Sequence, residues 1–123
     1  MNNYISSIKN ISSVSLTLKN GIEYIKKNIC VDTYDEDIEK LIEDSESALN
    51  TIDKVLTPLY SKIHSGSNLK NYTKRLKTIF KKMKEEFYCG NIDKCIILNK
   101  ESSDEYTKWK KAFDNTLGKY TIS

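Results

Sequence analysis

The stretch IEKLIEDSESALNTIDKVLTPL, residues 38–59, decides the fold of this chain. Its apolar side chains recur every three or four residues, which places them on one face of an α-helix. The spacing continues beyond Pro58, the only proline in the sequence, to Leu59 and Ile63. Proline lacks a backbone N–H, and its ring clashes with the carbonyl group four residues earlier. We therefore expect a helix over residues 34–64 that is kinked or broken at Pro58.

A similar apolar pattern precedes this stretch, between Tyr4 and Ile29. Its apolar residues follow one another in steps of four and three, with Ser15 at the one polar step. This heptad pattern predicts a helix over residues 3–30. Thr33, followed three residues later by Glu36, has the pattern of a capping box and marks the start of the next helix.

Further helices are predicted after the loop at His64-Ser-Gly-Ser-Asn. Residues 68–88 have one apolar and one lysine-rich face, with Ser67 or Asn68 as the cap and Cys89-Gly-Asn as the end. We expect a short helix over residues 92–99, a run that also fits an extended connector. Ser102 and Glu105 repeat the capping-box pattern and predict a last helix over residues 103–120.

The expected fold is all-α and forms one domain, residues 1–123. It is an antiparallel helical bundle or a long helical hairpin of four main helices plus one short helix, with coiled-coil-like seams. Neither a signal peptide nor a run of about 18 apolar residues is visible. The three cysteines form no CxxC pair, so we expect free thiols and a cytoplasmic protein.

Residues with catalytic or metal-binding chemistry are scarce. His64 is the only histidine, and no nucleophile elbow, phosphate loop or HExxH motif occurs. Cys89 and Cys95 with His64 offer at most three soft ligands, which is weak evidence for a zinc site. We therefore expect no enzyme, no metal and no cofactor.

The charges are unevenly distributed along the chain. Residues 32–53 hold nine acidic residues and one lysine, whereas residues 68–88 hold seven basic residues and two acidic ones. The basic residues form a stripe that either pairs with the acidic helix or binds nucleic acid, anionic lipid or an acidic partner. This basic stripe consists of Lys70, Lys74, Arg75, Lys77, Lys81, Lys82 and Lys84.

The apolar seams are candidates for contact with a partner as well as for the core. They can pack with each other, or they can pack against the helices of another protein. The last helix adds an aromatic residue of the kind that dominates binding hot spots. The candidate partner seam comprises Ile8, Ile11, Leu18, Ile22, Ile25, Ile29 and Trp109.

The order of several features in residues 45–120 is similar to that in one known family. It runs from Leu49-x-x-x-Asp53-x-x-Leu56-x-Pro58-Leu-Tyr60 through Lys74-x-Leu76, Phe87-Tyr88, Ile96-Ile97 and Asp104-Glu-Tyr106 to Leu117-x-x-Tyr120. This order resembles the N-terminal region of the seventy-kilodalton subunit of the exocyst, a vesicle-tethering complex. The resemblance implies assembly with other tethering subunits by helix pairing, without the lipid binding of that family's C-terminal rod.

These observations favour a non-enzymatic helical module for protein–protein interaction and assembly, of the kind found in vesicle tethering during exocytosis. Its partners are proteins bound by helix packing, or further copies of this chain, and no small-molecule substrate is expected. One alternative is a stand-alone viral or bacterial four-helix bundle that acts in immunity, secretion or host interaction by binding a partner. Another is a small binder of nucleic acid or anionic membranes through residues 68–88.

Overall fold

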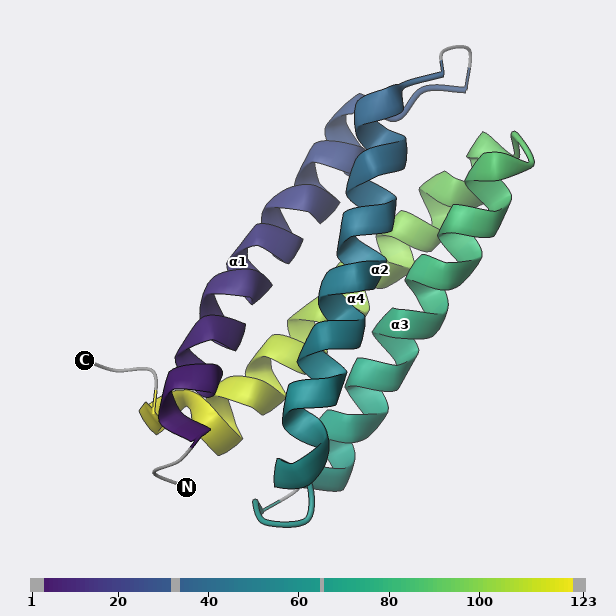
Figure 1. The fold of residues 1–123 in the computed structure, drawn as a ribbon. Helices are drawn as coiled ribbons and strands as arrows, with labels where there is room; N and C mark the ends of the chain where they lie inside the picture. Colours follow the sequence, from purple (N-terminus) through teal and green to yellow (C-terminus); the bar gives the residue numbers. More distant parts are fainter. Residues whose placement is uncertain (1–3, 32–33, 65, 121–123) are drawn as a thin grey trace.

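A computed structural model describes residues 4–31, 34–64 and 66–120. Its four α-helices are α1 (Ile5–Asn28), α2 (Glu36–Leu56), α3 (Gly66–Tyr88) and α4 (Ile92–Leu117) (Figure 1). Two 3-10 turns, η2 (Thr57–Leu59) and η3 (Gly118–Tyr120), follow α2 and α4. Within these ranges the chain contains no β-strand, so the expectation of an all-α fold is confirmed.

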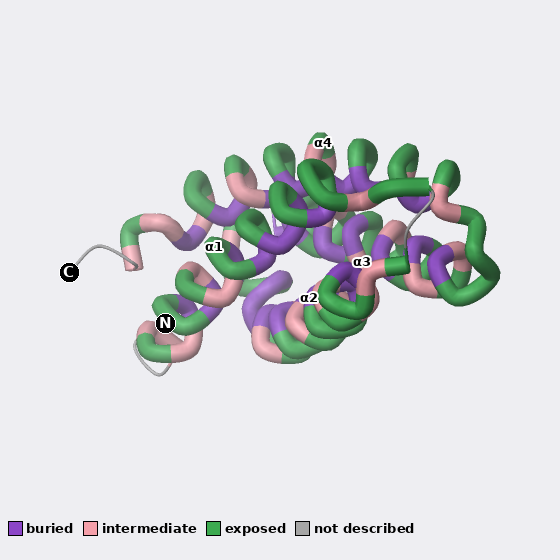
Figure 2. Tube along the Cα trace, turned by 90° about the horizontal axis from the view of Figure 1, so that it is seen from above, coloured by how far each residue is buried: buried purple, intermediate pink, exposed green. Residues whose placement is uncertain are grey.

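Each helix packs against two others. Helix α1 contacts α2 and α4, and α3 contacts the same two helices on the other side. Successive helices run in opposite directions, so the α1–α2 and α3–α4 connections lie at one end of the bundle (Figure 1). The buried residues face inward between the helices and the exposed residues face outward (Figure 2).

The core consists of the two predicted seams together with the apolar faces of α3 and α4. Phe80, Trp109 and Phe113 are its largest fully buried side chains, and the rings of Trp109 and Phe113 stack 5.2 Å apart. The candidate partner seam is buried in the chain's own core, apart from the partly buried Ile29. Its other members are at most 3% exposed, so in this structure the seam is not open to a partner.

The helix at Pro58 is broken rather than kinked. Helix α2 ends at Leu56, and Pro58 lies in the 3-10 turn η2. The N–H and the hydroxyl group of Thr57 both donate to the carbonyl oxygen of Asp53, so the end of the helix is capped before the proline. The prediction of helix up to residue 64 was wrong beyond this turn.

The start of α2 differs in detail from the predicted capping box. Thr33 lies outside the described residues. The observed N-cap is Asp35, whose carboxylate accepts a hydrogen bond from the backbone N–H of Asp37 at 2.8 Å. This cap satisfies one of the unpaired N–H groups at the helix start.

The prediction of two helices in the C-terminal part was wrong, because α4 is continuous. Ser102 is not a cap: it lies fully buried inside α4, where its hydroxyl donates to the Asn99 carbonyl at 2.7 Å. Asn99 is also buried, and its amide donates to the carbonyl of Ile22 in α1 at 3.1 Å. Because both polar residues are satisfied in the interior, the helix has no reason to end between them.

The loop before α3 is shorter than predicted, and the loop after it is as predicted. Helix α3 begins at Gly66, so Ser67 and Asn68 lie inside the helix instead of capping it. It ends at Tyr88, and Gly90 follows with a φ of 79°, the left-handed conformation that commonly closes a helix. None of the helices in the described ranges has the length and apolarity needed to cross a membrane.

Candidate partner-binding surface

The bundle has two halves of opposite charge. The half around the α2–α3 turn, residues 4–16, 47–64, 66–77 and 105–120, holds eleven Lys and Arg and three Asp and Glu. The other half, residues 17–31, 34–46 and 78–104, holds nine Lys and Arg and thirteen Asp and Glu. We call them the basic half and the acidic half. The antiparallel helices create this separation by bringing the start of α2 beside the ends of α1 and α3.

The exposed apolar side chains gather in the acidic half. Seven large apolar residues in the described part of the chain are exposed, and six of them lie there. The exception, Leu16, lies next to the boundary on α1. The six, which we call the apolar set, are Tyr24, Val31, Tyr34, Tyr88, Ile96 and Ile97.

Two members of the apolar set are held in place by contacts between elements. The Tyr34 ring lies 5.6 Å from the ring of Phe87, a buried residue of α3. Tyr88 donates its hydroxyl to the carboxylate of Glu43 on α2, and this hydrogen bond raises the pKa of Tyr88 to about 12. Tyr88 is therefore tied to α2 through its hydroxyl group, while more than half of its side chain stays exposed.

The cysteines are free in the structure and differ in accessibility. Cys30 and Cys89 are exposed in the acidic half, whereas Cys95 is buried. Burial raises the pKa of the Cys95 thiol to about 11, and the thiol group donates to the Met83 carbonyl at 3.5 Å. Cys95 therefore behaves as a core residue.

The members of the basic stripe on α3 differ in their contacts. Lys77 forms an ion pair with Asp53 at 2.9 Å, and Lys84 forms one with Glu46 at the same distance, both on α2. The Arg75 guanidinium lies over the ring of Tyr72. Part of the stripe therefore pairs internally, as one of the two interpretations predicted. The other four members, Lys70, Lys74, Lys81 and Lys82, are exposed.

A groove between α3 and α4 in the basic half was not predicted from the sequence. It contains His64 and four lysines, none of which belongs to the basic stripe. Lys62 comes from the α2–α3 turn, Lys108 and Lys111 from the C-terminal half of α4 and Lys119 from η3, so their grouping depends on the fold. Within the described residues, no three His, Cys, Asp or Glu side chains are grouped so that they could hold a metal ion.

The structure is a closed helical bundle with two halves: an acidic half that exposes most of the large apolar residues, and a basic half that holds the groove between α3 and α4. The chain belongs to the family described as a domain of unknown function, DUF8042, whose model matches residues 6–112. That match spans all of α2 and α3 and most of α1 and α4. Comparisons with curated proteins and with solved structures gave no match.

Proposed function

We propose that this chain is a non-enzymatic binding protein whose acidic half recognises a cationic, amphipathic segment of a partner protein. One observation carries the proposal: six of the seven exposed large apolar residues in the described chain lie in the half with the acidic excess. Single exposed apolar residues are common on protein surfaces, but an excess of them in one half of a molecule favours a binding surface in that half.

The chemistry of this half indicates the kind of partner. Apolar side chains gain about 25 cal/mol for each Å² that a partner removes from water. The carboxylates of Glu36, Asp37 and Asp93 are exposed in the same half, and they favour a partner of opposite charge. An amphipathic helix with lysine or arginine on its polar face satisfies both requirements.

A second copy of this chain is a poorer occupant. Two copies related by a two-fold axis would bring the same acidic surface of each together. The resulting repulsion opposes a dimer through this half, so we expect a monomer with a mass of 14.2 kDa in solution. Light scattering at increasing protein concentration measures this mass directly.

The role in vesicle tethering stays a prediction. If it holds, partner helices of other tethering subunits contact the outside of the bundle, because the internal seams are already filled. We also propose that the protein is cytoplasmic. The support is its two exposed free thiols, because thiols stay reduced in the cytoplasm.

The experiment compares two synthetic amphipathic peptides of equal length and identical apolar positions, one with a lysine-rich and one with a glutamate-rich polar face. Calorimetric titration should show binding of the lysine-rich peptide only. The double variant Tyr88→Ser with Ile97→Ser should weaken that binding at least about tenfold, the equivalent of 1.4 kcal/mol. Both residues are exposed, so the variant should keep its helical circular dichroism spectrum.

Leu16→Ser is the matched control, because Leu16 is the one exposed large apolar residue outside the acidic half among the residues that the structure describes. It should leave the affinity unchanged. Equal binding of both peptides, or equal loss in the control and the double variant, would contradict the proposal.

A further inference from the structure

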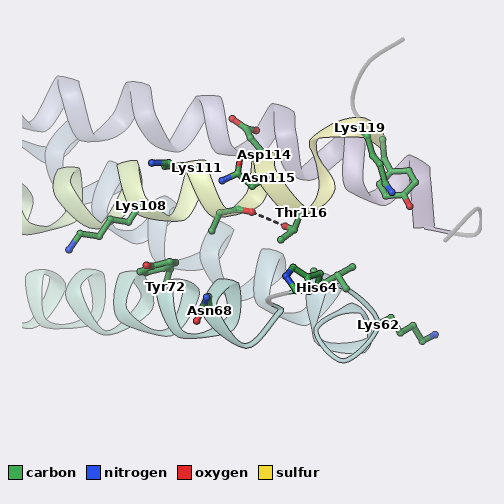
Figure 3. Close-up of a pocket in the computed structure, with 13 residues that line it drawn as sticks. Lys62, His64, Asn68, Tyr72, Lys108, Lys111, Asp114, Asn115, Thr116 and Lys119 are labelled. Carbon is green, nitrogen blue, oxygen red and sulfur yellow. Dashed lines mark hydrogen bonds between the residues drawn. The ribbon is translucent and has the colours of Figure 1, made fainter.

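We infer that the groove between α3 and α4 in the basic half binds a small ligand that carries two or more phosphate groups. The groove has a volume of about 800 Å³, within the range of small-molecule sites. This inference is independent of the proposed function, because the groove and the apolar set lie in opposite halves. Its walls come from the α2–α3 turn, the first turns of α3 and the last turns of α4 (Figure 3).

The lining of the groove is strongly cationic. Five of its side chains can carry positive charge: Lys62, His64, Lys108, Lys111 and Lys119. Asp114 is the single carboxylate among the described lining residues, and it already accepts a hydrogen bond from Lys110 outside the groove at 2.6 Å. Two of the cations have partners outside the groove: Lys108 forms an ion pair with Glu105 at 3.5 Å, and the Lys62 ammonium lies over the ring of Tyr4. Lys111 and Lys119 form no ion pair within the described residues, so the groove keeps an excess of positive charge, which favours an anionic ligand.

The arrangement of the cations indicates more than one phosphate. In Figure 3, Lys108 lies toward one end of the groove, whereas Lys62 and Lys119 lie toward the other. Between them, Asn68 and Tyr72 extend from α3 into the space below α4 and offer hydrogen-bond donors. A ligand with separated phosphates can meet cations at both ends and polar groups between them.

The surroundings of the groove favour a small ligand over a nucleic acid. A nucleic acid needs a continuous basic track. Here Lys77 and Lys84 of the basic stripe are paired with α2, and the acidic half repels an extended polyanion. Two kinds of molecule carry the separated phosphate groups that the groove favours: a free phosphorylated metabolite and a doubly phosphorylated lipid headgroup.

The first experiment is a calorimetric titration of the full chain with inorganic triphosphate. We expect saturable binding at one site. The double variant Lys62→Gln with Lys108→Gln should weaken it at least tenfold, because it removes a cation from each end of the groove. The control, Lys81→Gln with Lys82→Gln, removes the same charge from the exposed basic stripe on α3 and should leave the affinity within about twofold. All four lysines are exposed, and thermal melts should confirm that both variants stay folded.

Two further arms identify the source of the phosphates. Vesicles that carry a lipid with a doubly phosphorylated headgroup should sediment the protein if the ligand is a headgroup, and triphosphate should then release it. Binding of triphosphate without sedimentation points to a free metabolite. The inference is overturned if the binding of triphosphate does not saturate, or if both double variants lose the same affinity for triphosphate. It is also overturned if a DNA duplex competes with triphosphate and the binding of that duplex requires Lys81 and Lys82.

Discussion

At the scale of single residues, the turn between α2 and α3 depends on a glycine that has no room for a side chain. A Cβ atom on Gly66 would lie 1.9 Å from the carbonyl oxygen of Tyr60, so the backbone would have to move. We expect Gly66→Ala to lower the free energy of unfolding by about 2–4 kcal/mol. Urea unfolding followed by circular dichroism measures this change.

Gly21→Ala provides the control, because Gly21 is also buried but has space. Its Cβ would lie 3.7 Å from the Ser45 hydroxyl oxygen and 3.8 Å from a Leu41 methyl carbon, both ordinary contacts. Since alanine has a higher helix propensity than glycine, the free energy of unfolding of this variant should rise by up to about 1 kcal/mol. If the two alanine variants are equally stable, the tight turn at Gly66 is not present in solution.

At the scale of elements, apolar periodicity was sufficient to locate three of the four helices. Helices α1 and α3 have nearly unbroken apolar stripes, so their ranges were predicted closely. The predicted range of α2 ran to residue 64 instead of Leu56, because the apolar stripe continues beyond Pro58. Helix α4 was divided because Ser102 and Glu105 have the pattern of a capping box, although Ser102 and Asn99 are buried inside the helix. A hydrogen bond from Asn99 to the backbone of α1 compensates for its burial, and sequence spacing does not reveal such a partner.

The candidate surfaces were less predictable than the helices. Ile96 and Ile97 belong to a short apolar run in which periodicity alone does not separate buried from exposed positions, and the buried position belongs to Cys95. The lysines of the groove become neighbours only when α4 returns beside the α2–α3 turn. The local charge runs were visible in the sequence, but their separation into two halves follows from the antiparallel packing.

The contact between α3 and α4 includes a buried hydrogen bond that can be tested directly. The indole N–H of Trp109 donates to the Thr73 hydroxyl oxygen at 2.9 Å, and that hydroxyl donates to the Leu69 carbonyl at 2.8 Å. Thr73→Val preserves the shape but leaves the indole N–H without a partner. We expect a loss of about 1–3 kcal/mol in the free energy of unfolding. Thr78→Val, at an exposed position on α3, should cost less than about 0.5 kcal/mol.

At the scale of the whole molecule, two polar contacts help to join α1 to α4 and close the ring of helices. Asn99 provides one of them, and the other is the Tyr106 hydroxyl, which donates to the Ser15 carbonyl at 2.9 Å. Burial raises the pKa of Tyr106 above its ordinary value, so this donor also keeps its proton in mildly alkaline solution. The closed interior restricts binding to the outside of the bundle, where the two halves differ in charge.

This closure predicts that the bundle unfolds as one unit. Far-ultraviolet circular dichroism reports all four helices, whereas the fluorescence of the single tryptophan, Trp109, reports the interior next to α3. The two thermal melts should coincide, as expected for a small two-state domain. Tyr106→Phe should lower both midpoints together, at a cost of about 0.5–1.5 kcal/mol, because it removes one α1–α4 hydrogen bond. If helicity is lost before the fluorescence changes, part of the bundle, such as α1, opens separately. The seam along Ile8 and Ile22 would then become accessible to a partner helix after all.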